Sequence, residues 1–234
     1  MRTFLFAFAA VSVLASPASA ATRNFGITSF EKIRVDGPFK VKLTTGVAPF
    51  ATATGPQGAL DKVAIDVRGN TLVVHNSLES WGGNPGQPNG PVEISLGTHD
   101  LSAAWLNGSG ALAIDKVKGL TFDLSVQGSG SAAIGRADVD QLKVAVAGTA
   151  AATLAGRAGT MTAVVRGISS LNAANLTTKD ATVGAEGAAT VAANVGNSVT
   201  VDGSGPATIQ FTGGPACTLR VSGSTTVTGC KSSQ

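Results

Sequence analysis

The sequence is poor in the residue types that mark metal sites, redox centres and nucleic-acid binding. Its 234 residues include no tyrosine, two histidines and two cysteines, and only 13% of them are charged. Two cysteines and two distant histidines are too few for a typical metal site. Lysine and arginine are scattered singly, whereas nucleic-acid-binding surfaces gather basic residues on one face. We therefore predict no metal, no cofactor and no nucleic-acid partner.

Helical signals are also missing. No stretch of about ten residues combines apolar spacing of 3.6 residues with helix caps. Aromatic residues make up 5% of the chain, while glycine occurs 30 times and valine, leucine and isoleucine recur throughout. A core built from small and β-branched side chains favours strands over helices. The composition predicts an all-β protein.

The first twenty residues have the order of a secretory signal peptide. Arg2 precedes an apolar run that is too short to span a membrane comfortably, and Ala18-Ser19-Ala20 provides small residues at a cleavage site. Removing residues 1–20 leaves 16 basic and 14 acidic residues, a net charge of +2. We expect residues 21–234 to form a single exported domain without a transmembrane segment, in the periplasm or outside the cell.

The two cysteines, Cys217 and Cys230, lie near the C-terminus. In an exported protein such thiols tend to oxidise, so we predict a disulfide that holds the last turns of the chain. A metal site and a reactive thiol are the alternatives.

The central feature is a repeat. The segments "LNGSGALAI" (106–114) and "VQGSGSAAI" (126–134) share a glycine hinge between two apolar runs. Hinges recur every 18 to 20 residues, as expected for stacked β-rungs whose corners need glycine. The predicted corner residues are Gly108, Gly128, Gly148, Gly167, Ala185, Gly203 and Gly223.

Apolar residues flank these corners with a period of two, which is typical of strands. Two residues before the corners stand Leu106, Val126, Val146, Val165, Val183, Val201 and Val221, and the last rung adds Leu219. We predict a right-handed parallel β-solenoid, regular over residues 101–230, with at least two strands per rung. For residues 28–100 we predict less regular rungs that cap the stack, including a hairpin over 62–77 around Gly69-Asn70.

Taken together, these segments resemble a known bacterial family, DUF2807, whose description is "putative auto-transporter adhesin, head GIN domain". The resemblance rests on "FEKIRVDGPFKVKLTTG" (30–46), "GNTLVVHN" (69–76) and the serial corners "NGSGALAI", "QGSGSAAI", "DGSGPATI" and "SGSTTV", and it covers residues 28–230. It implies a β-solenoid, an exported or envelope location and no established enzymatic activity. The rungs "AGTAAAT", "RGISSLN" and "GAEGAAT" lack the glycine-serine-glycine signature, so we expect tighter or shifted corners there.

Signals of catalysis are weak. The corners match the dinucleotide pattern G-x-G-x-x-A, but this pattern works only when a helix follows it, and here strands follow. His99 and Ser102 suggest a hydrolase, yet residues of one short segment do not converge as a triad must. Asp138 and Asp140 could bind a cation or serve a polysaccharide lyase. We favour a solvated corner, because we see no cluster of basic and acidic residues at rung spacing around them.

Two tryptophans provide the candidate binding surface. Trp105 lies between the inward positions of Ala104 and Leu106 and should point outward, and Trp81 lies in a glycine- and proline-rich loop. Either the N-terminal segment covers them or they form a surface for a sugar, a peptide or another subunit. The leading hypothesis is a non-enzymatic binding or adhesion protein of the bacterial cell envelope, with an envelope polysaccharide or protein as partner. The alternatives are a carbohydrate-active enzyme and a module that assembles through its strand edges.

Overall fold

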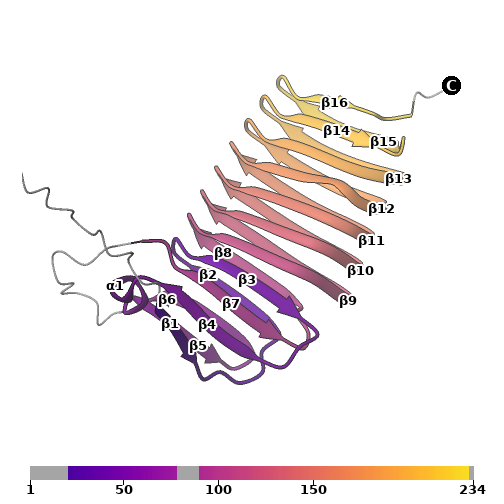
Figure 1. The fold of residues 1–234 in the computed structure, drawn as a ribbon. Coiled ribbons are helices and arrows are strands. Elements are labelled where there is room, and N and C mark those ends of the chain that lie inside the picture. The colour runs from indigo at the N-terminus through magenta and orange to yellow at the C-terminus, as the bar shows by residue number, and fades with distance from the viewer. Residues whose placement is uncertain (1–20, 78–89, 232–234) are drawn as a thin grey trace, which may run out of the picture.

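The computed structural model describes residues 21–77 and 90–231, and most of this chain is β-strand (Figure 1). The N-terminal part contains one helical turn, α1 (Gln57–Leu60), and eight short strands: β1 (Ala21–Phe25), β2 (Lys32–Asp36), β3 (Lys40–Thr45), β4 (Phe50–Gly55), β5 (Val63–Arg68), β6 (Thr71–Asn76), β7 (Glu93–Thr98) and β8 (Ala103–Gly108). Long strands follow: β9 (Ala111–Gly128), β10 (Ser131–Gly148), β11 (Ala151–Gly167), β12 (Ser170–Glu186) and β13 (Thr190–Ser204). The C-terminal end contains β14 (Thr208–Thr212), β15 (Ala216–Ser222) and β16 (Thr226–Thr228).

The long strands stack in parallel and in register, which confirms the predicted β-solenoid (Figure 1). Ser131 of β10 pairs with Ala111 on one side and with Ala151 on the other, and the same alignment continues through β12 and β13. Each long strand is one bent rung whose backbone groups bond to the rungs before and after it. One hydrophobic core runs through the stack from Phe30 to Phe211.

The core follows the predicted period of two. Leu106, Val126 and Val146 are at most 1% exposed, and the equivalent residues of the later rungs are buried as far as Val201. Burial of such side chains stabilises the fold by roughly 1.5 to 3 kcal/mol each. The last rung differs from the prediction: Leu219 and Val221 are 45% and 46% exposed. They lie on β15, which pairs with β13 on one side and has no further strand beyond it among the described residues.

Each rung also contains a middle stretch of inward side chains that the sequence did not reveal. It includes Val117, Val139, Ala158, Leu176 and Val195, all of them buried. The stretch begins where the pairing shifts, for example between Ile134 and Ala137 of β10. A rung therefore has three inward stretches separated by bends.

Glycines with positive φ form a column along one corner of the solenoid. They are Gly37, Gly108, Gly128, Gly148, Gly167, Gly187, Gly205 and Gly223. Two predicted corners, Ala185 and Gly203, are wrong by two residues. Both residues are buried and pair with each other inside β12 and β13, because these strands continue before they turn at Gly187 and Gly205.

The N-terminal rungs are not stacked in sequence order. The rung made by β2 and β3 lies between the rung of β6 and β7 and the rung of β8 and β9. The expected hairpin is present, because β5 and β6 pair antiparallel around Gly69 and Asn70. At the far end, β4 pairs antiparallel with β7, and β1 pairs antiparallel with β4. These antiparallel strands close the N-terminal end of the stack.

The C-terminal end is held by a disulfide between Cys217 and Cys230, as predicted, with 5.7 Å between the Cα atoms. It joins β15 to the segment after β16. In the chain-entropy model, closing a loop of this size stabilises a fold by roughly 3 kcal/mol. The last rung is therefore fixed covalently, although its outer edge carries no further strand within the described chain.

Candidate binding surfaces

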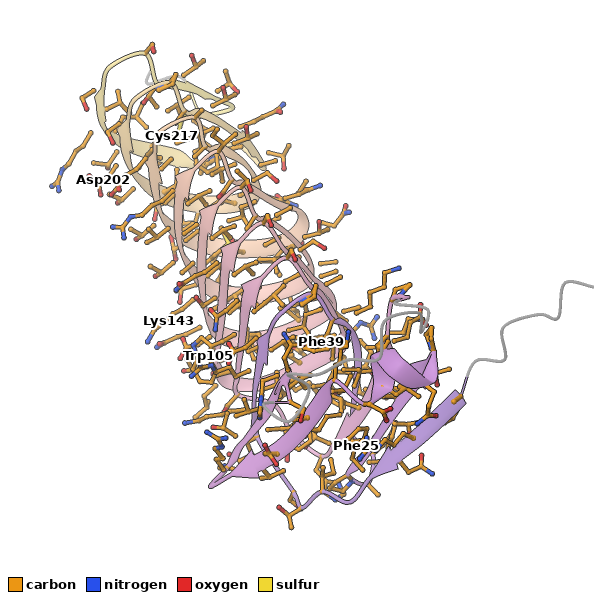
Figure 2. All side chains as sticks on the ribbon, turned by 90° about the vertical axis from the view of Figure 1, so that its left-hand side faces the viewer. Phe25, Phe39, Trp105, Lys143, Asp202 and Cys217 are labelled. Carbon is orange, nitrogen blue, oxygen red and sulfur yellow. A yellow bond between two sulfur atoms is a disulfide. The ribbon has the colours of Figure 1, made fainter. Side chains whose placement is uncertain are left out.

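Outward side chains form columns, because equivalent positions of successive rungs lie in register. One column runs from Trp105 through Ser125, Ala145, Val164 and Gly184 to Asp202. Figure 2 shows Trp105, Lys143 and Asp202 along the same long side of the solenoid. A ligand that lies along this side would meet one side chain of each column per rung, about 4.8 Å apart.

Trp105 is half-buried on this side of the solenoid. Trp105 is aligned in the strand register with Arg34 of β2 on one side and with Ser125 of β9 on the other. The N-terminal strand thus lies beside Trp105 while part of the residue stays accessible. Trp81, the other tryptophan of the predicted surface, lies outside the described residues.

Polar groups beside Trp105 are held in place by hydrogen bonds. Arg34 Nε lies 2.8 Å from Asp36 Oδ2, and Asn107 Nδ2 donates to Asp36 Oδ1 at 2.7 Å. Partial burial alone would raise the pKa of Asp36, but the hydrogen bonds from Arg34 and Asn107 outweigh it and lower that pKa below its ordinary value. We call Trp105, Arg34, Asp36 and Asn107 the Trp105 surface.

A second feature is a groove of about 340 Å³ on another outer side, which we call the alanine groove. Small residues of three successive long strands line it: Ala111, Ala113, Ser131, Ala133, Ala151 and Thr153. Lys40, Lys42 and Glu93 line its N-terminal end, and Lys42 Nζ lies 3.4 Å from Glu93 Oε2. The groove therefore combines a largely apolar floor with two cations and one carboxylate at one end.

The third feature surrounds Asp138, where the sequence led us to expect no cluster of basic and acidic residues at rung spacing. That expectation is wrong, because Asp138 pairs in register with Lys118 of β9 and with Arg157 of β11. Arg157 Nε donates to Asp138 Oδ1 at 2.8 Å, and Arg157 Nη2 donates to Oδ2 at 3.2 Å. This ion pair engages Asp138. Asp140, the other aspartate singled out, is exposed and its backbone carbonyl accepts a hydrogen bond from Thr160.

The histidines do not form a hydrolase site with the residues considered above. The Ser102 hydroxyl donates to the carbonyl of Glu31 at 3.2 Å, not to His99. His99 instead lines a small hollow of about 170 Å³ with Lys116 and Lys118. His75 lies 2.9 Å from Asp66 on the neighbouring strand of its hairpin. Within residues 21–77 and 90–231, no group of three or more histidine, cysteine or acidic side chains is arranged to hold a metal ion.

The stack of bent rungs, with its long outer columns and its covalently closed end, defines the protein as a β-solenoid with extended surfaces. The chain belongs to the family described as "Putative auto-transporter adhesin, head GIN domain", DUF2807, whose model matches residues 29–215. The resemblance noted in the sequence is thereby confirmed. Among proteins of curated function, none has a matching sequence.

Several solved structures share the fold. A putative adhesin from Bacteroides fragilis is 19% identical and has a TM-score of 0.75, with 89% of this chain and 96% of that chain covered. A protein from Parabacteroides distasonis described as a putative lipid binding protein is 17% identical and has a TM-score of 0.71, with 90% and 96% covered. A putative adhesin from Parabacteroides merdae is 17% identical and has a TM-score of 0.64, with the same coverage.

The described part of this chain contains no helix that is long and apolar enough to cross a membrane.

Proposed function

We propose that this protein is an exported, non-enzymatic binding protein that presents its outer columns to a polysaccharide or protein at the bacterial cell envelope. The family description, which names an adhesin head, supports a binding role. The disulfide and the signal-like residues 1–20 support export.

The observation that carries the proposal is the Trp105 surface. Trp105 is partly accessible, and an accessible tryptophan ring is an apolar surface on which the C–H face of a sugar ring can pack. Arg34, Asp36 and Asn107 place charged and amide groups beside it, held in position by their mutual hydrogen bonds. Such a combination of an aromatic face and fixed polar groups suits a saccharide better than a purely apolar ligand.

The first test is glycan-array binding, followed by calorimetry with the glycans found. We expect Trp105→Ala to weaken binding at least about tenfold, because a central aromatic anchor commonly contributes more than 1.4 kcal/mol. Ile168→Ala is the matched control, since Ile168 is an exposed apolar residue that lies outside this column. In a Trp81→Phe background, acrylamide should quench the remaining fluorescence. Complete shielding of Trp105, or equal effects of both variants, contradicts the proposal.

The same glycans separate binding from catalysis. A carbohydrate-active enzyme would leave new reducing or unsaturated ends, which chromatography of the incubated glycan detects. We expect the glycan to be recovered intact. Product formation that depends on this protein would overturn the non-enzymatic part of the proposal.

A second candidate function is binding of an anionic amphiphile in the alanine groove. Its floor crosses β9, β10 and β11 and its cations lie on β3, so it spans three strand spacings, roughly 14 Å. One structural neighbour is described as a putative lipid binding protein. Lys40 and Lys42 could receive an acidic head group while the apolar chain lies on the alanines.

Calorimetry with a twelve-carbon fatty acid tests this candidate. Ala133→Lys should abolish binding, because a long charged side chain would fill the floor of the groove. Ala192→Lys is the control: Ala192 continues the column of Ala133 two strands beyond the groove. Equal binding by the wild type and Ala133→Lys would exclude the groove as the site.

A further inference from the structure

We propose that the hollow around Lys118, Arg136 and Arg157 binds the oxyanion groups, sulfate or phosphate, of an acidic polysaccharide. We call this region the basic hollow; it has a volume of about 530 Å³ and is also lined by Ala137, Asp138, Gly156 and Thr177. It lies on different residues from the Trp105 surface and does not depend on the function proposed there.

The charge of the hollow is unbalanced. Three successive rungs contribute one lining cation each, Lys118 from β9, Arg136 from β10 and Arg157 from β11. The only acid that lines this hollow among the described residues is Asp138, so the lining carries a net charge of +2. Lys116, which pairs in register with Arg136, adds a further cation beside it. Such an excess of positive charge attracts an anion and is only partly neutralised by the protein itself.

One of the cations is oriented before any ligand arrives. Arg157 uses Nε and Nη2 to bond both oxygens of Asp138. This pair also lowers the pKa of Asp138 below its ordinary value, so the carboxylate stays charged at neutral pH. Within the described chain, the bonds to Asp138 leave the N–H groups of Arg157 Nη1 for another acceptor. A guanidinium fixed in this way suits the oxygen geometry of sulfate and phosphate.

The floor of the hollow stays open because it lacks large side chains. Gly156 has a φ of 114° and would place any Cβ against the carbonyl oxygen of Ala137. A larger residue at this position is therefore disfavoured both by the backbone conformation and by the lack of space. The three cations consequently surround a space that the chain does not fill with its own atoms.

The mixed lining favours a polysaccharide over a membrane surface. Asp138 stands among the cations and would repel a dense layer of lipid phosphates. The same carboxylate and the Thr177 hydroxyl can instead bond sugar hydroxyls while the cations hold the oxyanions. A sugar chain that carries both hydroxyl and oxyanion groups offers a partner to each kind of lining side chain.

The experiment compares dextran sulfate, uncharged dextran and phosphatidylglycerol vesicles as probes at about 0.15 M salt, where the screening length is about 8 Å. We expect dextran sulfate to bind and uncharged dextran not to bind. Arg136→Ala should weaken binding about tenfold, the effect of losing a charge-assisted hydrogen bond. Lys143→Ala is the matched control, because this substitution also removes one positive charge. Lys143 is exposed on the long side of the solenoid that carries Trp105 (Figure 2).

The outcomes are distinct. Selective loss with Arg136→Ala, together with competition by inorganic sulfate or phosphate, supports the oxyanion site. Equal weakening by Lys143→Ala would mean attraction by net charge alone and would overturn it, as would the absence of binding to dextran sulfate. Binding to the vesicles only would assign the hollow to lipid phosphates and overturn the polysaccharide ligand. Trp105→Ala should leave dextran sulfate binding unchanged, so that failure of the Trp105 surface and failure of the basic hollow can be told apart.

Discussion

Individual glycines determine where the rungs turn. Gly128 has a φ of 105°, and a Cβ there would lie 2.7 Å from the carbonyl oxygen of Gly108 on the neighbouring rung. Both the backbone conformation and the close approach exclude a side chain at this position. The corner column is thus a set of residues at which the identity of the amino acid is dictated by the stack.

We predict that Gly128→Ala lowers the free energy of unfolding by about 1 to 3 kcal/mol, through backbone strain and a shift of the neighbouring rung. Gly184→Ala is the control: Gly184 has no positive φ, and its nearest neighbour would lie 3.8 Å from a new Cβ. That change should be neutral or slightly stabilising. Urea unfolding followed by circular dichroism measures both. Equal midpoints for the two variants would contradict the strained corner.

Residue patterns predicted most corners but not all of them. Gly108 and Gly128 stand first in their glycine-serine-glycine triplets and turn the chain, whereas at 203–205 the second glycine of the triplet turns it. Both glycines of such a triplet satisfy the pattern, and only the length of the preceding strand decides between them. Only part of the Trp105 surface could be predicted from the sequence. The outward position of Trp105 follows from the period of two, but its neighbours on β2 are brought to it by a pairing between distant segments.

At the scale of the element, each rung depends mainly on its two neighbours. Period two revealed the inward residues before and after each corner, because those stretches are regular. The middle stretches escaped detection because bulges change the phase there, as between Ile134 and Ala137, which are both buried although they stand an odd number of residues apart. The basic hollow could not be predicted from the sequence for a related reason. Its lining residues come from different rungs, and they lie side by side only when the register between those rungs is known.

This neighbour dependence predicts that a whole rung can be removed. Deleting residues 131–150 takes out β10 and its corner and brings Ala151 opposite Ala111, the residue that Ser131 pairs with now. We expect a folded, cooperative protein with a smaller dependence of unfolding free energy on urea, because less surface is buried. Deleting residues 131–140 instead removes half a rung, breaks the alignment of inward side chains and should prevent folding. Folding of both deletions, or of neither, would contradict the nearest-neighbour account.

At the scale of the whole molecule, the order of the N-terminal rungs is the feature that sequence reasoning could not reach. Residues 28–100 were predicted to form less regular rungs with a hairpin over 62–77, but nothing in their composition indicates that β2 pairs with β6 on one side and with β8 on the other. Such pairings join residues far apart in the sequence and are decided by the final fit of the rungs. The two ends also differ: antiparallel strands cover the N-terminal end, whereas a disulfide holds the C-terminal one.

The rung of β2 and β3 lies between two rungs that are formed by later segments of the chain, and this position constrains the order in which a newly made chain can fold. A chain that leaves a ribosome or a translocation pore N-terminus first exposes β2 and β3 long before their partners on β6, β7, β8 and β9 are available. Pairing of β3 on its second side must therefore wait until residues 111–114 of β9 have emerged. We therefore expect the rung of β2 and β3 to be enclosed on both sides only after β9 has begun to emerge, so that a late step of assembly completes an early segment of the chain.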